Sequence, residues 1–381
     1  MQTENNIKAL FQSKFDKEVE VLAKAPGRIN VIGEHTDYNL GYVLPAAIDY
    51  HMYFGLSKND KGVFNIYSHT FERLVSLTES DLEPAEDSWL NLVKGIIYQL
   101  KDKIGGFDMV IFGDIPVGAG LSSSAALCCG TATALNALFN LDLKKWDIAR
   151  IAQKSEHDFV HVKCGIMDQF ACLFGRTNHV LLLDCETLEF EESETDISGY
   201  QFFLINSNVQ HELNESEYNA RRIESTEALS ILKGHNSAIN TFKDVSLELI
   251  RSLESNEVWW KRAFHIVSEN LRVQAVNRAL KEKNMLEVGQ LISQGHKSQK
   301  EYYEITCPET DFLAENLQEE QIVLGARQVG GGFGGCILGI AEDAGVEGML
   351  DRINQKYNQA FNKQITKIPI RISRGYHIIH N

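Results

Sequence analysis

Short apolar runs alternate with longer stretches of helical periodicity along the first half of the chain. Three of these runs have the length and composition of buried strands, namely 19–25, 109–112 and 180–183. After Ser122 the pattern changes, and apolar or small side chains recur at helical spacing, at Leu127, Thr131, Leu135 and Leu138. The sequence therefore predicts a strand, a glycine-containing turn and a helix in succession.

The second half of the chain begins with another predicted strand, 202–205, followed by a polar and charged stretch. A long amphipathic helix comes next, in which four large apolar side chains share one face, Trp260, Phe264, Val267 and Leu271. We interpret this stripe as core. The run 336–341 predicts a strand that leaves a tight turn made by the glycine cluster 330–335.

A chain of 381 residues is too long for one compact core and suits two domains of ordinary size. We place the boundary within residues 184–198, where the acidic string 189–194 separates two strand-like runs. The predicted domains are residues 1–190 and residues 191–381, and the second of them contains the glycine cluster.

Composition and charge narrow the range of partners. Fifty-two acidic residues against 37 basic residues give a formal net charge of -15, which disfavours binding to nucleic acid or to an anionic membrane. The opening residues lack the pattern of a signal peptide, and no apolar run approaches the roughly 18 residues of a membrane span. We therefore expect a cytoplasmic protein. Seven cysteines, an odd number, indicate reduced thiols rather than a disulfide framework.

The stretch 114–126 combines a strand end, small residues, three consecutive serines and the start of a helix. Glycines let the backbone approach a phosphate, and a helix start supplies unpaired N–H groups and a partial positive charge. This stretch therefore predicts a binding site for the phosphates of ATP, although it lacks the Gly-Lys-Ser/Thr ending of the common P-loop. The alternative interpretation is a serine-capped helix that follows a glycine turn.

The segment 25–39 is dense in groups that can hydrogen-bond a polyol. Carboxylates accept hydrogen bonds from pairs of sugar hydroxyls, and a guanidinium such as that of Arg28 orients a carboxylate or an oxyanion. Glu34, His35 and Asp37 therefore form a candidate hydroxyl-reading cluster. The alternative is a polar loop with a capping aspartate.

Two further segments contain candidate chemistry. An aspartate held beside an apolar segment is a candidate general base, and Asp168 stands in such a place. His157, His161 and Cys164 have the spacing of zinc ligands on a helix, but no fourth ligand stands out, so we favour a structural role for them. The glycine cluster 330–335 is either a tight turn or backbone pressed against the active site of the first half.

Taken together, these segments resemble the galactokinase family, which belongs to a superfamily with the homoserine, mevalonate and phosphomevalonate kinases. Residues 27–39 look like the family signature, and residues 116–126 look like the ATP motif of the superfamily. Further matching segments follow in the same order along the chain, 89–95, 164–169, 206–209, 216–222, 307–309 and 325–335. The resemblance covers nearly the whole chain. It implies an α/β mixed (α+β) fold of two domains with the active site between them.

The resemblance also implies a reaction, the ATP-dependent phosphorylation of galactose at its C1 hydroxyl, with Mg²⁺ as cofactor. It implies that Asp168 takes the proton from this hydroxyl while Arg28 stabilises the transition state, and that Ser124 and Glu156 bind magnesium. The residues implied to line the sugar are Glu34, His35, Thr36, Asp37, Gly165 and Tyr218. Those implied to hold the ATP phosphates are Gly118, Ala119, Gly120, Leu121, Ser122, Ser123 and Ser124, and those implied to lie near the nucleotide are Ser68 and Trp89.

Physical chemistry bears on two of these roles. A magnesium ion held by one carboxylate, one hydroxyl and phosphate oxygens suits the preference of that ion for few protein ligands. Arg28 beside Asp168 favours the ionised carboxylate, which leaves open whether Asp168 is a true base or mainly an orienting anion. We favour the base.

Three other functions fit parts of the pattern. A kinase for N-acetylgalactosamine or another sugar differs by a small change in the pocket, although by resemblance Thr36 favours plain galactose. A non-catalytic galactose sensor on the same fold requires loss of a catalytic group, whereas all four such groups are present, Arg28, Ser124, Glu156 and Asp168. A nucleotide-binding structural module leaves the hydroxyl-reading cluster without a purpose. We expect a monomer or a weak homo-oligomer.

Overall fold

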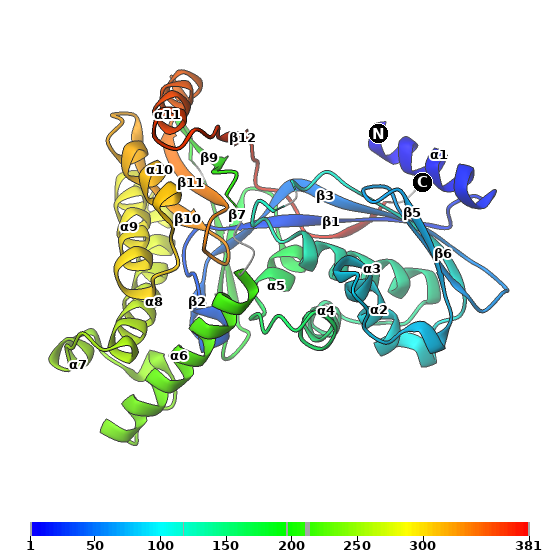
Figure 1. Ribbon diagram of the computed structural model, residues 1–381, viewed down its shortest axis with the longest axis horizontal. Coiled ribbons are helices and arrows are strands. Elements are labelled where there is room, and N and C mark those ends of the chain that lie inside the picture. Colours follow the sequence, from blue (N-terminus) through cyan, green and yellow to red (C-terminus); the bar gives the residue numbers. More distant parts are fainter. Residues whose placement is uncertain (1, 117, 196, 210–213, 380–381) are drawn as a thin grey trace.

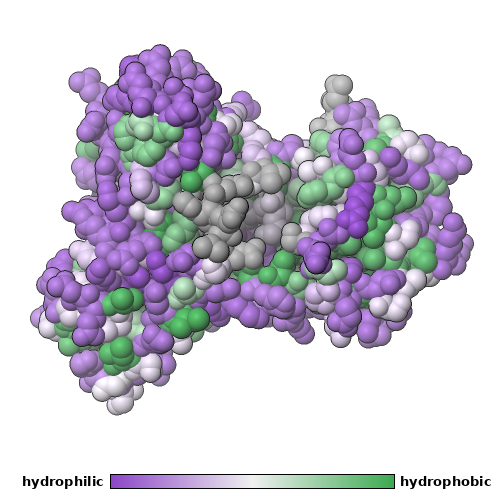
Figure 2. Space-filling view, in the orientation of Figure 1, coloured by the Kyte–Doolittle hydropathy of each residue, from purple (hydrophilic) through white to green (hydrophobic). Residues whose placement is uncertain are grey.

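The computed structural model describes residues 2–116, 118–195, 197–209 and 214–379. It forms two lobes that are built on separate β-sheets, with helices packed against each sheet (Figure 1). Figure 2 shows that hydrophilic residues dominate this face of the molecule, especially over α11 (Val346–Phe361), in agreement with the net charge of -15. Within the described residues, no helix is both long and apolar enough to cross a bilayer.

The sheet of the first lobe has six strands. In the order in which they lie side by side, these are β13 (His377–Ile379), β1 (Val21–Asn30), β3 (Pro45–Lys58), β6 (Phe107–Gly113), β4 (Phe64–Ser68) and β5 (Arg73–Leu77). The strands predicted at 19–25 and 109–112 are confirmed as β1 and β6. Strand β13 returns from the end of the chain to pair with β1, and the division into residues 1–190 and 191–381 stays a prediction.

Helices cover both faces of this sheet (Figure 1). Helix α1 (Gln2–Phe15) packs on one face against β3 and β6, and α3 (Ser123–Phe139) packs on the other against β1 and β3. Three helices pack against α3, namely α2 (Ser88–Leu100), α4 (Lys145–Phe159) and α5 (Met167–Phe174). The positions predicted to share the inner face of α3 are all buried, Leu127, Thr131, Leu135 and Leu138. Burial of this face places the start of α3 beside the end of β1.

The second lobe contains a four-stranded sheet and most of the remaining helices. The strands, in spatial order, are β10 (Val323–Val329), β11 (Cys336–Glu342), β9 (Tyr200–Asn206) and β12 (Thr366–Ile368). The helices are α6 (Asn214–His235), α7 (Leu247–Ser252), α8 (Val258–Lys281), α9 (Met285–Ser298), the π-helical turn η5 (Gln299–Tyr303), α10 (Pro308–Gln318) and α11. Short 3-10 helices occur at Asp37–Asn39, Glu79–Asp81, Lys101–Lys103 and Phe242–Asp244. The strands predicted at 202–205 and 336–341 are confirmed as β9 and β11.

Most of the acidic string 189–194 forms a strand of its own, which lies between the two predicted strand-like runs. Strand β8 (Phe190–Glu194) pairs with β7 (His179–Asp184), and β7 pairs with β2 (Tyr42–Val43) in a three-stranded sheet. Within β8 only Ser193 is buried, and its hydroxyl donates to Asn277 of α8. Charged side chains are tolerated there because β8 is an edge strand with one solvent-exposed face.

The predicted apolar stripe of α8 is only half correct. Trp260 and Val267 are buried, but Leu271 is 47% exposed. In the second half of the helix, the buried positions include Glu269 and Asn270, because this part of α8 packs against polar main chain of the first lobe. The helix therefore combines an apolar core face with a polar one.

Candidate active site

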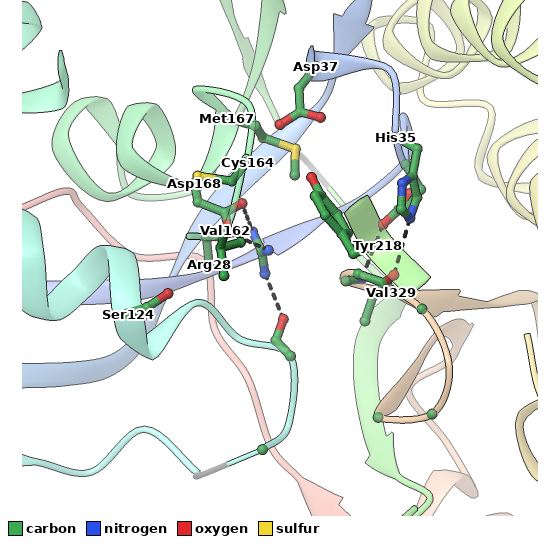
Figure 3. A pocket seen from close by; sticks show the side chains of 18 of the residues that line it. Arg28, His35, Asp37, Ser124, Val162, Cys164, Met167, Asp168, Tyr218 and Val329 are labelled. Carbon is green, nitrogen blue, oxygen red and sulfur yellow. Dashed lines mark hydrogen bonds and ion pairs between the residues drawn. The ribbon is translucent and has the colours of Figure 1, made fainter. Parts of the chain in front are cut away.

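A cavity of about 330 Å³ lies between the two lobes (Figure 3). Its wall combines β1 and the loop after it, the loop before α3, helices α4 and α6, the start of α5 and the turn between β10 and β11. The wall contains these predicted residues: Arg28, Glu34, His35, Asp37, Gly118, Gly120, Ser124, Glu156, Asp168 and Tyr218. Most of the glycine cluster 330–335 also lines it, which confirms that this backbone is pressed against the site. Segments far apart in the sequence therefore converge on one cavity.

Arg28 and Asp168 form an ion pair in this wall (Figure 3). Arg28 Nε donates to Asp168 Oδ1 over 2.6 Å and Nη2 donates to Oδ2 over 2.8 Å, so the pair is bidentate. Arg28 Nη1 donates to the main-chain oxygen of Gly120 over 2.7 Å, and the hydroxyl of Ser122 donates to Asp168. The Arg28 side chain is 7% exposed and that of Asp168 is 24% exposed. A nearly buried guanidinium thus fixes an accessible carboxylate and links it to the glycine loop.

The backbone of β1 explains why Arg28 reaches this position. The register of β1 against β3 shifts between Pro26 and Arg28, since proline cannot donate a ladder hydrogen bond and a bulge re-aims the next side chain. Arg28 N donates to the main-chain oxygen of Leu121 over 3.1 Å. A Cβ on Gly27 would lie 2.7 Å from that same oxygen, so only glycine permits this close approach.

The loop before α3 ends in a helix as predicted, but Ser122 does not cap that helix. Gly118, Gly120 and Ser122 all adopt left-handed backbone angles, with φ of +71°, +71° and +58°. No side-chain cap hydrogen bond is formed at the start of α3 within the described residues, and the Ser122 hydroxyl binds Asp168 instead. Because Ser124 lines the cavity, the uncapped helix start borders it. The serine-capped interpretation is therefore wrong for Ser122.

The other residues of this loop lie outside the cavity wall. The side chains of Ala119 and Leu121 are buried in the core, and Ser123 is half-buried at the beginning of α3. Their main-chain groups are what the loop can offer a ligand. Val117 belongs to the predicted stretch but lies outside the described residues.

Glu156 of α4 lies beside Ser124, with which it shares a hydrogen bond. Burial raises the pKa of the Glu156 carboxyl to about 7, and the nearby charge of Asp168 adds to this rise. Gln169 Nε2 donates to Glu156 Oε2, and Cys164 Sγ lies 3.4 Å from the same oxygen. A buried carboxylate is costly to ionise unless a cation lies beside it. Glu156 and the neighbouring Ser124 hydroxyl on the cavity wall are therefore suitable ligands for a magnesium ion.

Glu34 is anchored by an arginine from the other lobe. Arg327 of β10 is fully buried and pairs through Nη2 with Glu34 Oε2, and its Nη1 donates to the main-chain oxygen of Val31 over 2.7 Å. Burial lowers the pKa of Arg327 to about 9. The second oxygen of Glu34, Oε1, accepts from Gly330 N over 3.4 Å. Glu34 thus joins the loop after β1 to the turn between β10 and β11.

Asp37 and Gly165 are in close contact on one side of the cavity. Burial raises the pKa of Asp37 to about 6, with the charge of Asp168 as the next cause. A Cβ on Gly165 would lie 2.0 Å from Asp37 Oδ2. Gly165 itself lines a neighbouring cavity that also touches Asp37. Thr36 is fully buried outside the wall, and its hydroxyl donates to the main-chain oxygen of Tyr42 over 2.7 Å.

His35 and Tyr218 complete the opposite side. The His35 ring lies 5.0 Å from the ring of Tyr218, centroid to centroid, and Tyr218 projects from α6. In Figure 3 Arg28 and Asp168 stand on one side of Tyr218 and His35 stands on the other. The cavity is therefore bounded by an ion pair, carboxylates and aromatic rings, which suits a polar ring-shaped ligand.

Ser68 and Trp89 do not belong to the cavity wall. Ser68 is the buried last residue of β4, and Trp89 lies in the first turn of α2. The Trp89 ring stacks on that of Phe71, with centroids 5.2 Å apart and an interplanar angle of 16°. Phe71 is 56% exposed, so this stack stands at the surface.

The residues with zinc-like spacing form a structural contact. His157 Nε2 donates to the main-chain oxygen of Cys164 over 2.8 Å, and His161 is exposed. Among the residues that the structure describes, no group of three or more His, Cys, Asp or Glu side chains is arranged to hold a metal ion.

Helix α8 provides buried polar contacts to the loop after β1 that the sequence did not reveal. These are His265 Nε2 to the Glu34 carbonyl (3.2 Å), Gly33 N–H to Glu269 Oε1 (3.0 Å) and Tyr42 N–H to Asn270 Oδ1 (2.9 Å). Burial lowers the pKa of His265 to about 3, so the ring is neutral. The wall also contains apolar residues that we did not predict, Val162, Met167, Val209 and Val329. The polar residues spaced along the inner face of α8 could have indicated these contacts. Their partners could not be identified from the sequence, because they lie more than 200 positions away.

Three family models match this chain. The first, galactokinase galactose-binding signature, matches residues 9–58. The second, GHMP kinases N terminal domain, matches residues 91–176, and the third, GHMP kinases C terminal, matches residues 276–359. These three segments contain Arg28, the loop before α3 and the glycine cluster.

Relatives and solved structures agree with these models. The chain is 40% identical to a galactokinase of Thermosipho africanus over 92% of its length and 98% of the relative. It is 38% identical to a galactokinase of Bacillus subtilis, with 93% of each chain covered. The crystal structure of Lactococcus lactis galactokinase complexed with galactose superimposes with a TM-score of 0.93 at 34% identity, covering 98% of this chain and 99% of the other. A mevalonate kinase structure shares the fold, with a TM-score of 0.63. The chain therefore belongs to the galactokinase family of the GHMP kinases.

Proposed function

We propose that this protein transfers a phosphoryl group from ATP to the C1 hydroxyl of galactose, giving galactose 1-phosphate and ADP. The observation that carries this proposal is the Arg28–Asp168 ion pair in the wall of the cavity. A glycine and serine loop with an uncapped helix start lies on one side of this pair, and the loop with Glu34 lies on the other. Membership in the galactokinase family supports the choice of galactose.

We assign Asp168 to accept the proton of the C1 hydroxyl and Arg28 to stabilise negative charge on the transferred phosphoryl group. Phosphoryl transfer passes through a loose transition state, so positioning and charge neutralisation supply most of the rate enhancement. Arg28 is already held by Asp168 and by the Gly120 carbonyl, so the pair needs little reorganisation during the reaction. The proton moves to Asp168 as the bond from the sugar oxygen to phosphorus forms and the bond from phosphorus to ADP breaks.

The loop from Gly118 to Ser124 is assigned to the ATP phosphates, through main-chain N–H groups and the start of α3. Ser124 and Glu156 would hold magnesium, which neutralises phosphate charge when it is bound. Two protein ligands are few, and this suits an ion that keeps water and phosphate oxygens as its other ligands. The assignment of Ser68 and Trp89 to the nucleotide rests on family membership.

The sugar is assigned to Glu34, His35, Asp37 and Tyr218, which share the cavity wall. Thr36 and Gly165 lie outside this wall and support Asp37. The Thr36 hydroxyl holds the turn that orients Asp37, and the missing side chain of Gly165 leaves room for the Asp37 carboxylate. Carboxylates on both sides of a sugar ring accept hydrogen bonds from its hydroxyls.

Glu156→Gln is expected to raise the free Mg²⁺ concentration needed for half-maximal activity by at least about tenfold. The wild-type protein should show a pH dependence that the variant lacks. Below about pH 7 the Glu156 carboxyl holds a proton, so the Mg²⁺ requirement should rise about tenfold per pH unit as the pH falls, and it should level off above pH 7. Magnesium titrations at saturating ATP measure both effects. Glu301→Gln, at a surface helix position, is the matched control, and a Glu156→Gln titration equal to the control would remove Glu156 from the site.

Gly165→Ala is expected to raise the KM for galactose by about tenfold or more and to leave the KM for ATP within about twofold. The added Cβ would lie 2.0 Å from Asp37 Oδ2, so the carboxylate must move. Steady-state kinetics with each substrate varied in turn measure the two constants. Gly234→Ala, where a Cβ meets nothing within 4 Å, is the control. An unchanged KM for galactose would show that Asp37 does not contact the sugar.

A panel of sugars tests the function directly. The purified protein is given magnesium-ATP with galactose, N-acetylgalactosamine, glucose, arabinose or mevalonate, and ADP release is measured. Release with galactose alone supports the proposal, and release with N-acetylgalactosamine instead would replace the substrate. No release, with a melting temperature that galactose still raises, would indicate a galactose sensor.

We further propose that the protein acts in the cytoplasm as a monomer or a weak homo-oligomer. Sedimentation velocity measures the oligomeric state.

A further inference from the structure

Both ring nitrogens of His35 are bonded to protein groups, and these bonds fix where its proton lies. Nε2 lies 3.2 Å from the main-chain oxygen of Gly331, and Nδ1 lies 2.7 Å from the hydroxyl of Tyr38. A carbonyl oxygen can only accept a hydrogen bond, so Nε2 carries the proton. Burial lowers the pKa of His35 to about 3, so the ring is neutral and Nδ1 has a free lone pair. The Tyr38 hydroxyl therefore donates to Nδ1.

Tyr303 extends this chain of hydrogen bonds by one step. Its hydroxyl lies 2.8 Å from that of Tyr38, and it must donate because the Tyr38 proton is already directed at His35. Tyr303 is fully buried, and burial raises its pKa to about 12, so it keeps its proton at any physiological pH. The direction of each bond follows from the Gly331 carbonyl: Tyr303 donates to Tyr38, Tyr38 donates to His35, and His35 donates to Gly331.

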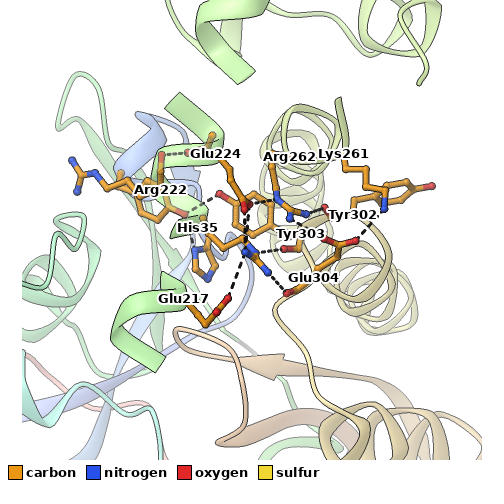
Figure 4. A network of polar contacts seen from close by, with 12 residues as sticks. His35, Glu217, Arg222, Glu224, Lys261, Arg262, Tyr302, Tyr303 and Glu304 are labelled. Carbon is orange, nitrogen blue, oxygen red and sulfur yellow. Dashed lines mark hydrogen bonds and ion pairs between the residues drawn. The ribbon is translucent and has the colours of Figure 1, made fainter. Parts of the chain in front are cut away.

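Two arginines, Arg221 and Arg262, hold Tyr303 in place, and Figure 4 labels the second of them. Tyr303 is the last residue of the π-helical turn η5, where carbonyl groups lack partners within the helix. Arg221 of α6 donates to the main-chain oxygens of Tyr303 (2.8 Å) and Glu304 (2.9 Å). Arg262 of α8 donates to the main-chain oxygen of Tyr302. Three consecutive carbonyls are thus held by side chains from two different helices.

Carboxylates in turn fix these two arginines. Glu224 lies 2.6 Å from Arg262 Nε and 3.4 Å from Arg221 Nη1, and the Glu304 carboxylate lies 2.8 Å from Arg262 Nη2. Arg262 is 2% exposed, so its two ion pairs are shielded from solvent on the arginine side. Figure 4 shows Arg262 and Glu304 on the side of Tyr303 that faces away from His35. The two arginines and their carboxylates therefore fix the backbone of Tyr303, and with it the position of the Tyr303 hydroxyl.

We propose that Tyr38 and Tyr303 are positioning residues for galactose phosphorylation, because their hydroxyls hold His35 as a neutral ring with its proton on Nε2. This inference rests on the proposed function, since His35 and Gly331 both line the cavity assigned to the sugar. His35 uses its single ring proton on the Gly331 carbonyl, so this chain of hydrogen bonds fixes both the His35 ring and the glycine turn at the edge of the sugar cavity.

Nitrogen-15 NMR of histidine-labelled protein measures the proton position directly. The His35 signals are identified by their absence in His35→Gln. At pH 7 the expected result is a protonated Nε2 and an unprotonated Nδ1. A proton on Nδ1, or exchange between the two forms, would overturn the inference. This measurement needs no activity, so it decides the inference even if the wild-type protein fails to phosphorylate galactose and the proposed function falls.

Kinetics test the positioning role. Tyr38→Phe removes the donor to Nδ1 and is expected to raise the KM for galactose by about tenfold, and Tyr303→Phe by about threefold, with kcat and the KM for ATP within about twofold. Tyr302→Phe is the control, since this neighbouring ring packs against Trp260 and Phe264. An unchanged KM for galactose in both test variants, or an equal rise in Tyr302→Phe, would contradict the positioning role. If Tyr38→Phe does not fold, Tyr303→Phe and the NMR result decide.

Discussion

Asp168→Asn is expected to reduce kcat for galactose phosphorylation by about 10²- to 10⁴-fold, with galactose binding retained. Asparagine keeps the size of the side chain but cannot take the proton of the C1 hydroxyl. It also loses the charge that pairs with Arg28 over two hydrogen bonds. Steady-state kinetics measure the loss, and isothermal titration with galactose measures the binding.

The control for this variant is Asp102→Asn, at the surface, which should leave kcat unchanged. If Asp168→Asn keeps kcat within about threefold of wild type, the carboxylate is neither base nor essential orienting group. If kcat falls and galactose binding is lost as well, Asp168 acts mainly in binding the sugar. The pair of measurements thus separates a role of Asp168 in phosphoryl transfer from a role in binding the sugar.

Arg327→Met is expected to lower the free energy of unfolding by about 3–5 kcal/mol, the largest stability effect that we predict. Arg327 is fully buried and pairs with Glu34, which is only 2% exposed. Removing one partner leaves a buried carboxylate without its counter-charge and two main-chain carbonyls without a donor. Urea denaturation followed by fluorescence measures the change.

Two further variants test whether the loss of stability comes from the buried ion pair or would follow from replacing any arginine. Arg352→Met breaks an ion pair at the surface, where Arg352 is 56% exposed, and should leave the stability close to that of the wild-type protein. Arg327→Met combined with Glu34→Gln removes both charges and should recover part of the lost stability without restoring galactose affinity. A loss in Arg327→Met no greater than in Arg352→Met would contradict a stabilising role for the buried pair.

Local patterns in the sequence predicted those parts of the fold that depend on neighbours in the chain. The periodicity of α3 and the apolar runs of β1, β6, β9 and β11 belong to elements that are buried in the core, and this burial leaves a local pattern in the sequence. Strand β8 was not predicted because every residue of it except Ser193 is exposed, so its sequence shows no apolar alternation. Leu271 was assigned to the core because helical spacing alone does not show which elements pack against each part of a long helix.

The same distinction holds for the site. Arg28, Glu34, Asp37 and Asp168 were found because motifs with catalytic residue types stand out in a sequence. Arg327 and Glu269 were not assigned, since each supports the loop after β1 from an element hundreds of positions away. The hydrogen bond of the Ser122 hydroxyl to Asp168, instead of to the helix end, also depends on a contact between distant parts of the sequence. Supporting residues are therefore revealed by packing, whereas reacting residues are revealed by their chemistry.

The position of the phosphoryl group in the product tests the account most directly. The protein is incubated with magnesium-ATP and galactose, and the product is examined by proton–phosphorus correlation NMR. We predict one new phosphate ester whose phosphorus correlates with the proton on C1, formed together with ADP in equal amount. A phosphorus that correlates with the protons on C6, or ADP formed without any sugar phosphate, would contradict the assignment of this cavity to transfer at the C1 hydroxyl.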